Sequence, residues 1–267
     1  QIGGTSLSEQ IRDARLDSLI EAVVLRVNSP GGSALASDII WREVVKTKEA
    51  GKPFIVSMGD VAASGGYYIA CEGDRIFAQE NTITGSIGVF GIIPFTGDML
   101  KNKLGVTFDR VQTNDHAILS LNKKLTDSEY KLIQQGVDDI YDDFISKVGA
   151  GRNMTKVEVD SIGQGRVWAG KDAIGIGLID EFGGLHDAIN YAAEKAGIAE
   201  ADIAIKYYPE AKNSELFDLL ESLEEEDESA AAQSQLEMQL TDIYNYLKTI
   251  GKTSQIQARV PYLYWID

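Results

Sequence analysis

The chain has 267 residues, of which 44% are hydrophobic, and this is enough to bury the core of one large domain. Its formal net charge of −16 argues against binding to the phosphate backbone of a nucleic acid. The chain contains no run of about 18 apolar residues and no basic segment followed by an apolar one. We therefore expect neither a membrane span nor a signal peptide within these residues.

The chain begins with Gln1 rather than methionine, which we interpret as the start of a piece of a longer protein. Any membrane anchor or export signal is then expected upstream of it. The single cysteine, Cys71, cannot form an internal disulfide and is expected on the apolar face of a helix.

Apolar periodicity predicts alternating helices and short buried strands over residues 1–209. Helical spacing predicts helices at residues 6–17, 34–50, 64–72, 94–104, 126–148, 157–162 and 185–196. Short apolar runs predict strands at residues 22–27, 54–58, 75–78, 106–111, 166–168 and 203–208, with a bent strand or loop at 81–89. Thr126 and Glu129 have the spacing of a capping box. This alternation implies parallel strands joined by right-handed crossovers.

The character of the sequence changes after Pro209, and we predict a domain at residues 1–209 followed by an extension at residues 210–267. The extension contains an acidic run at residues 215–228, a predicted helix at 235–247 and an extended aromatic tail at 257–266. Consecutive acidic residues do not converge on one point, which favours an exposed link over a metal site. The tail is expected to dock on the body or on a neighbouring subunit.

The residues around Ser64 are the strongest candidate for a site of chemistry. Ser64 stands between Ala63 and Gly65 after an apolar run and before a helical pattern. Small neighbours let a substrate backbone approach closely, and the N–H groups at a helix start can face a negative charge. This is a setting for a nucleophile with an oxyanion hole. A tight turn whose serine only caps the helix would give the same local pattern.

A second turn, at residues 29–33, also follows a predicted buried strand. Ligands of parallel sheets bind outside the carboxyl ends of the strands, so both turns are expected at one edge of the sheet. A glycine N–H from this turn, together with Ser64 and the N–H of Gly65, would supply the donors and nucleophile that acyl transfer requires.

Four motifs in this order resemble the signal peptide peptidase A family (protease IV, peptidase family S49). They lie at residues 27–33, 62–67, 84–88 and 165–170, and the resemblance extends over about residues 10–196. It implies an α/β fold of the crotonase/Clp-protease type, with stacked ββα units and mainly parallel strands. It also implies that Ser64 is the nucleophile, that the N–H groups of Gly32 and Gly65 form the oxyanion hole, and that Ser86 helps to hold the general base.

The family uses a Ser–Lys dyad, and this chain has no lysine at the position where short members carry it. That segment reads Thr113-Asn114-Asp115-His116-Ala117-Ile118. Lys123 and Lys124 follow in a stretch that looks exposed, and His116 remains a conceivable but disfavoured base. His186 is expected to be a surface residue. Long members are tandem repeats, and this chain is similar to their C-terminal half, so the lysine is expected from an N-terminal repeat.

The resemblance implies a serine endopeptidase that degrades cleaved signal peptides at the bacterial inner membrane, on the extracytoplasmic side. It implies a peptide substrate, a homo-oligomer and an upstream membrane segment, with no cofactor, metal or nucleic acid. A substrate groove lined by Val61, Ile87, Val89 and Phe90 is expected, with a possible contribution from Tyr67. This fragment alone is expected to be inactive.

Two alternatives remain open at this stage. A crotonase-type acyl-CoA enzyme would use the two glycine N–H groups on a thioester but would need a carboxylate and no serine. A non-catalytic scaffold subunit would account for a serine without a base.

Overall fold

The computed structural model describes residues 3–114, 117 and 120–209. Our predictions for residues 210–267 lie outside this range, so the division of the chain into a domain and an extension stays a prediction. Within the described ranges, no helix combines the length and apolar character needed to cross a lipid bilayer.

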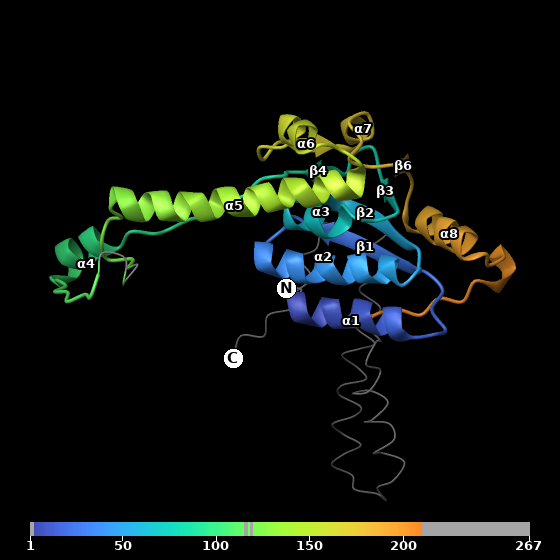
Figure 1. The fold of residues 1–267 in the computed structure, drawn as a ribbon, viewed down its shortest axis with the longest axis horizontal. Coiled ribbons are helices and arrows are strands. Elements are labelled where there is room, and N and C mark those ends of the chain that lie inside the picture. Colours follow the sequence, from blue (N-terminus) through green and yellow to red (C-terminus); the bar gives the residue numbers. More distant parts are fainter. Residues whose placement is uncertain (1–2, 115–116, 118–119, 210–267) are drawn as a thin grey trace, which may run out of the picture. The chain divides into compact units, whose positions relative to one another are not determined.

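Helices and strands alternate as the apolar periodicity predicts (Figure 1). The helices are α1 (Gly4–Leu16), α2 (Ala34–Glu49), α3 (Gly65–Ala70), α4 (Gly97–Leu104), α5 (Asp127–Arg152), α6 (Lys156–Ile162), α7 (Gly170–Ala173) and α8 (Leu185–Ala196), with a 3₁₀ turn at Glu200–Asp202. The strands are β1 (Val23–Ser29), β2 (Phe54–Ala63), β3 (Arg75–Ala78), β4 (Ile83–Gly85), β5 (Val167–Ala169) and β6 (Glu181–Phe182). The capping box of Thr126 and Glu129 is confirmed at the start of α5.

Strand β2 is the centre of the sheet. It pairs in parallel with β1 along one edge, and with β3 and then β4 along the other. Strand β6 adds in parallel to β3, and only β5 runs antiparallel, beside β4. The predicted α/β class with mainly parallel strands is confirmed.

The two faces of the sheet are covered by different helices, as period-two alternation along buried strands requires. Phe54 and Val56 of β2 face the larger core, which α2, α3 and the C-terminal half of α5 complete. Ile55 points the other way, to a smaller core where it packs with Phe77 and α8. The nearly uniform burial of β2 is therefore explained by helices on both sides.

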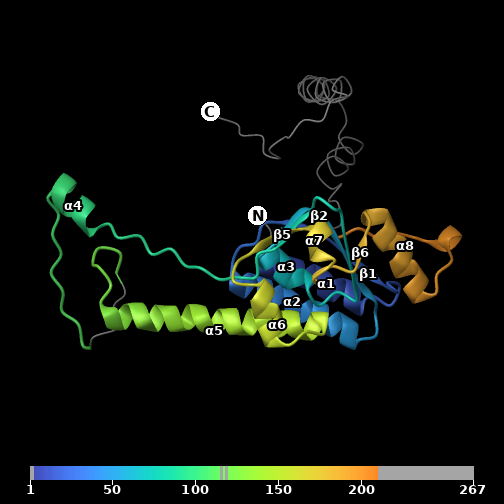
Figure 2. The same cartoon turned by 90° about the horizontal axis from the view of Figure 1, so that it is seen from above.

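Helix α5 packs on the body only through its C-terminal half. Phe144, Ile145 and Val148 are buried there, whereas Tyr130 and Leu132 near its start are exposed. In both views the N-terminal half extends beyond the sheet toward α4 (Figure 1, Figure 2).

The pairing of β1 with β2 is interrupted just before both strands end. Val27 pairs with Met58, but Ser29 pairs with Ala62, so β2 carries extra residues. Side chains hold this irregularity, because Asn28 Oδ1 accepts the N–H of Val61 at 3.1 Å. A polar side chain at residue 28 thus supports the segment of β2 that leads to Ser64.

Two strand predictions are wrong. Residues 106–111 and 203–208 form no strand, although both runs are apolar and β-branched or aromatic. Val111 is 94% exposed and Ile205 is 49% exposed, so neither run faces the core that a strand of the sheet would need. The two-residue strand β6 was not predicted, because Glu181 and Phe182 carry no local pattern and are ordered by β3.

Candidate active site

Ser64 lies at the junction between β2 and α3, with a backbone conformation that L-residues rarely adopt. Its φ is 53° and its ψ is −120°. The surrounding hydrogen bonds hold it there: its N–H donates to the Gly85 carbonyl and its own carbonyl accepts the N–H of Tyr68, both at 2.9 Å. Such a conformation costs about 1–3 kcal/mol and persists where neighbouring structure imposes it.

The side chain of Ser64 does not cap α3. Ser64 is the N-cap residue of the helix, but capping by its hydroxyl does not explain a serine at this position. The residue is partly exposed, and its hydroxyl has no hydrogen-bond partner among the described residues.

The turn after β1 touches the start of α3, so both turns lie together at the carboxyl edge of the sheet, as expected. Gly31 has a φ of +105°, and a Cβ built there would lie 2.8 Å from both Gly65 N and Ser64 Cβ. A Cβ on Gly65 would lie 3.1 Å from Gly32 N. Only glycine lets the two turns approach so closely.

Two backbone donors are consequently close together beside Ser64. Neither the N–H of Gly32 nor that of Gly65 donates to an acceptor in the part of the chain that the structure describes. Gly32 is exposed and Gly65 partly so. Unpaired N–H groups at such a place can bind an oxyanion.

Strand β4 places Ser86 next to this serine junction. Gly85 binds the N–H of Ser64, and the next residue, Ser86, is partly exposed with a φ of 49°. The N–H of Ser86 donates to the carbonyl of Arg166 at 2.8 Å. The glycines of this segment are explained by close packing: a Cβ on Gly88 would lie 2.7 Å from Gly165 Cα.

No candidate general base is found beside Ser64 among the described residues. Lys123 pairs with Glu129 at the start of α5, the end remote from the body (Figure 1), and Lys124 lies 5.5 Å from the centroid of the Phe95 ring. His186 is exposed, as expected. His116 lies outside the described residues.

The predicted groove lining is partly wrong. Ile87 is only 1% exposed and belongs to the core, while Phe90 is 82% exposed. Tyr67 is fully buried, and its hydroxyl donates to the Leu178 carbonyl at 2.8 Å. It supports α3 from below and cannot contact a substrate.

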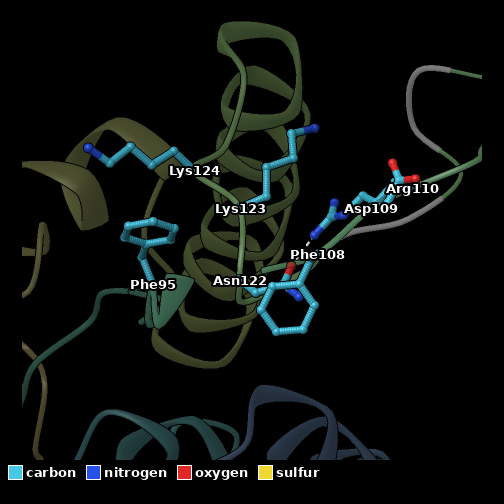
Figure 3. Close-up of a pocket in the computed structure, with 7 residues that line it drawn as sticks. All are labelled: Phe95, Phe108, Asp109, Arg110, Asn122, Lys123 and Lys124. Atoms are coloured by element: carbon cyan, nitrogen blue, oxygen red, sulfur yellow. Dashed lines mark hydrogen bonds between the residues drawn. The ribbon is translucent and has the colours of Figure 1, made fainter. Parts of the chain in front are cut away.

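A pocket of about 480 Å³ lies near the start of α5, away from the sheet. Figure 3 shows its lining, in which the Arg110 guanidinium donates to the Asn122 side chain. It is lined by Phe95, Phe108, Asp109, Arg110, Asn122, Lys123 and Lys124. The predicted nucleophile, oxyanion-hole glycines and Ser86 do not belong to it, whereas the disfavoured base candidates Lys123 and Lys124 do. Nor does any group of His, Cys, Asp or Glu within the described ranges have the arrangement of a metal site.

Sequence reasoning missed two contacts that support the site, one at Gly65 and one at Ser86. Ser37 of α2 is buried, and a Cβ on Gly65 would lie 2.6 Å from its Oγ. The carbonyl of Arg166 fixes Ser86 from β5's side of the sheet. Only the motif at residues 165–170 could have indicated the second contact, and it gives no geometry.

The fold and this site define an α/β protein with a free serine hydroxyl and two unpaired glycine N–H groups at the carboxyl edge of a parallel sheet. The sequence pattern of "Peptidase family S49" matches residues 46–199. This is more than half of the chain, and the chain belongs to that family.

Curated relatives match over most of this chain. It is 44% identical over 199 residues to "Protease 4" of Salmonella typhi, covering 74% of this chain and 32% of that protein. It is 40% identical over 238 residues to "Protease 4" of Haemophilus influenzae, covering 88% and 38%. A "Putative signal peptide peptidase SppA" of Enterococcus faecium is 36% identical over 195 residues, covering 73% and 56%. The chain thus spans about a third of the length of the first two relatives.

Among solved structures, a ClpP1 mutant from Listeria monocytogenes superimposes with a TM-score of 0.47 at 14% sequence identity. The superposition covers 69% of this chain and 86% of that one.

Proposed function

We propose that this chain supplies the nucleophile and the oxyanion hole of a serine endopeptidase of the Ser–Lys type. The observation that carries the proposal is the partly exposed Ser64, held at a φ of 53° beside two N–H groups that have no acceptor among the described residues. Membership of peptidase family S49 supports the choice of a peptide bond as the substrate.

In the proposed reaction Ser64 Oγ attacks the scissile carbonyl carbon while a neutral lysine takes the hydroxyl proton. The carbonyl oxygen becomes an oxyanion and accepts the N–H groups of Gly32 and Gly65. The C–N bond then breaks as the lysine ammonium returns the proton to the leaving amine. Water hydrolyses the resulting acyl ester by the same proton route. Ser86, which follows the residue that binds the Ser64 N–H, is proposed to orient the lysine.

The lysine is proposed to come from an N-terminal repeat of the same longer protein. No lysine among the described residues hydrogen-bonds the Ser64 hydroxyl, and the chain spans about a third of its Protease 4 relatives. A base from outside this chain would explain why the partly exposed Ser64 hydroxyl has no hydrogen-bond partner among the described residues. The fragment by itself is then inactive.

The proposed substrates are remnants of cleaved signal peptides, and the proposed location is the extracytoplasmic side of a bacterial inner membrane. The name of the Enterococcus faecium relative supports this substrate class. Self-association into a homo-oligomer and attachment through an upstream membrane segment are part of the same proposal.

A non-catalytic scaffold is the second candidate, and the same absence of a lysine beside Ser64 favours it. The acyl-CoA alternative has no such support, because the chain belongs to a peptidase family. In a scaffold, Ser64 would stay unreactive even when the rest of the protein is present.

The test compares Ser64→Ala with Ser161→Ala in the natural full-length protein. Ser161 is exposed on α6 and serves as a matched control. We expect a fluorophosphonate probe to label Ser64, and we expect Ser64→Ala alone to lose both labelling and cleavage of apolar peptides. Unchanged cleavage in Ser64→Ala, or a wild-type protein that neither reacts nor cleaves, would refute the proposal. Tight binding of coenzyme A would instead favour the acyl-CoA alternative.

A further inference from the structure

Three helices meet at one partly buried ammonium group near the serine junction. Lys147 of α5 is 13% exposed, and its Nζ lies 2.6 Å from Asp38 Oδ1 on α2 and 2.8 Å from Tyr68 Oη on α3. It also pairs with Asp143, one turn earlier on α5, and lies 4.6 Å from the centroid of the Trp41 ring. We call these five residues the Lys147 cluster.

Tyr68 completes the cluster, because its hydroxyl contacts both carboxylates. The Tyr68 hydroxyl lies 3.1 Å from a carboxylate oxygen of Asp38 and 3.1 Å from one of Asp143. The Tyr68 ring also packs on Phe144 with ring centroids 4.6 Å apart. A single cation thus pairs with two carboxylates and fixes the orientation of the hydroxyl between them.

The two helices that the cluster joins are those that begin at the candidate active site. Tyr68 is one turn after Ser64, and its N–H donates to the Ser64 carbonyl at 2.9 Å. Asp38 is four residues after Ala34, the first residue of α2, which at 1.5 Å per residue places it about 6 Å along the helix. Helices are stiff, so a shift of Asp38 or Tyr68 also moves the N-terminal ends of α2 and α3.

The spacing of those ends matters for an oxyanion hole. The N–H of Gly32 comes from the turn before α2 and that of Gly65 from the first residue of α3. The two groups can bind one oxygen only while α2 and α3 keep their distance. A displacement of about 1 Å in an active site can lower a rate by about 100-fold. The backbone contacts between the turns fix one point, and the cluster fixes a second point further along the same helices.

Lys147 is not itself a candidate for the missing base. Burial lowers its pKa, but hydrogen bonds to Asp143, Asp38 and Tyr68 outweigh burial and raise the pKa above the usual value. An ammonium with three acceptors keeps its proton. It acts as a fixed charge.

We propose that Lys147 is a positioning residue for the Ser64 site: by binding Asp38 and Tyr68 together it sets the distance between the N–H groups of Gly32 and Gly65. This inference rests on the proposed peptidase function.

The test uses Lys147→Met, which keeps most of the unbranched side chain but removes the ammonium group, in the natural full-length protein. Lys156→Met is the matched control, because Lys156 also pairs with an α5 carboxylate, Asp142 at 2.7 Å, but reaches neither α2 nor α3. Lys147→Arg restores the positive charge. Kinetics with a peptide ester, and the affinity of a peptide aldehyde that forms a tetrahedral adduct, are measured for each variant.

We expect Lys147→Met to lower kcat about 10- to 100-fold with KM within about twofold of wild type. The aldehyde is expected to bind more weakly by a similar factor, since its adduct uses both N–H groups. Lys147→Arg is expected to recover most of the activity, and Lys156→Met to remain within twofold. A merely structural role would lower the amount of active protein without weakening the aldehyde, and would therefore overturn the proposal.

Tyr68→Phe covers the case in which Lys147→Met does not fold. It removes the hydroxyl and keeps the ring against Phe144, and it is expected to lower kcat in the same way. A folded Tyr68→Phe with wild-type kcat overturns the inference. If wild type cleaves, Ser64→Ala does not, and both cluster variants behave as wild type, the positioning role fails while the peptidase function stands. If wild type and Ser64→Ala are equally inactive, the proposed peptidase function is refuted, and the positioning role, which rests on it, falls with it.

Discussion

Replacing Gly31 by alanine tests the contact between the two turns directly. The residue has a φ of +105°, and the new Cβ would lie 2.8 Å from Gly65 N, 2.8 Å from Ser64 Cβ and 3.0 Å from Ala63 O. Two of these neighbours are backbone atoms, which cannot rotate away as the end of a flexible side chain could. The substitution must therefore move one turn relative to the other.

The size of the effect follows from these distances. Ordinary contact begins at about 3.4 Å, so the turns must separate by about 0.6 Å (3.4 − 2.8) at the closest points. The positive φ costs about 1–3 kcal/mol for alanine, and overpacking costs a further 1–3 kcal/mol or so. The unfolding free energy is expected to fall by about 2–6 kcal/mol. A shift of 0.6 Å at the oxyanion hole is expected to lower kcat/KM at least about tenfold.

Gly51→Ala is the matched control. Gly51 also has a positive φ, +84°, but a Cβ there meets nothing within 4 Å among the described residues. Gly51→Ala therefore carries the cost of a positive φ but creates no steric clash. Thermal melting and fluorophosphonate labelling of the natural full-length protein are compared for both variants, and Gly31→Ala is expected to melt lower and to label more slowly.

The reasoning fails if Gly31→Ala and Gly51→Ala lose equal stability and both label at the wild-type rate. That result would show that the close approach of the two turns is not needed for either stability or reactivity.

Two further predictions concern the support of the fold. Hydrogen bonds from the backbone and hydroxyl of Thr126, and then from Lys123, lower the pKa of Glu129 from 4.5 to about 2. The stabilisation by this carboxylate is therefore complete above pH 4.5 and is lost as the pH falls toward 2. Glu129→Gln is expected to speed amide exchange in the first turn of α5 at pH 7, with a difference from wild type that shrinks below pH 4.5; a difference independent of pH would contradict this. Tyr67→Phe leaves the buried Leu178 carbonyl without its donor and is expected to lower the unfolding free energy by about 1–3 kcal/mol in urea titrations. Ser64 labelling should not change, and an unchanged midpoint would refute the role of the hydroxyl.

Local pattern was sufficient where a segment's own residues decide its structure. The strand at residues 75–78 and the helix at 185–196 have the predicted bounds, since their apolar spacing matches the faces that they bury. The same reasoning failed at residues 106–111 and 203–208. A β-branched run needs a neighbouring strand, and its own sequence does not say whether one is present.

The sequence by itself determined the alternation of helices and parallel strands and singled out Ser64 as a hydroxyl between small residues at the end of a strand. The tertiary structure decided the rest. Pairing with β4 extends β2 to Ala63, and only the approach of Gly31 brings two unpaired N–H groups to that serine. The link from Lys147 to Tyr68 joins residues 79 positions apart. Such contacts depend on the path of the whole chain, because residues distant in sequence meet only after the sheet and its covering helices have packed.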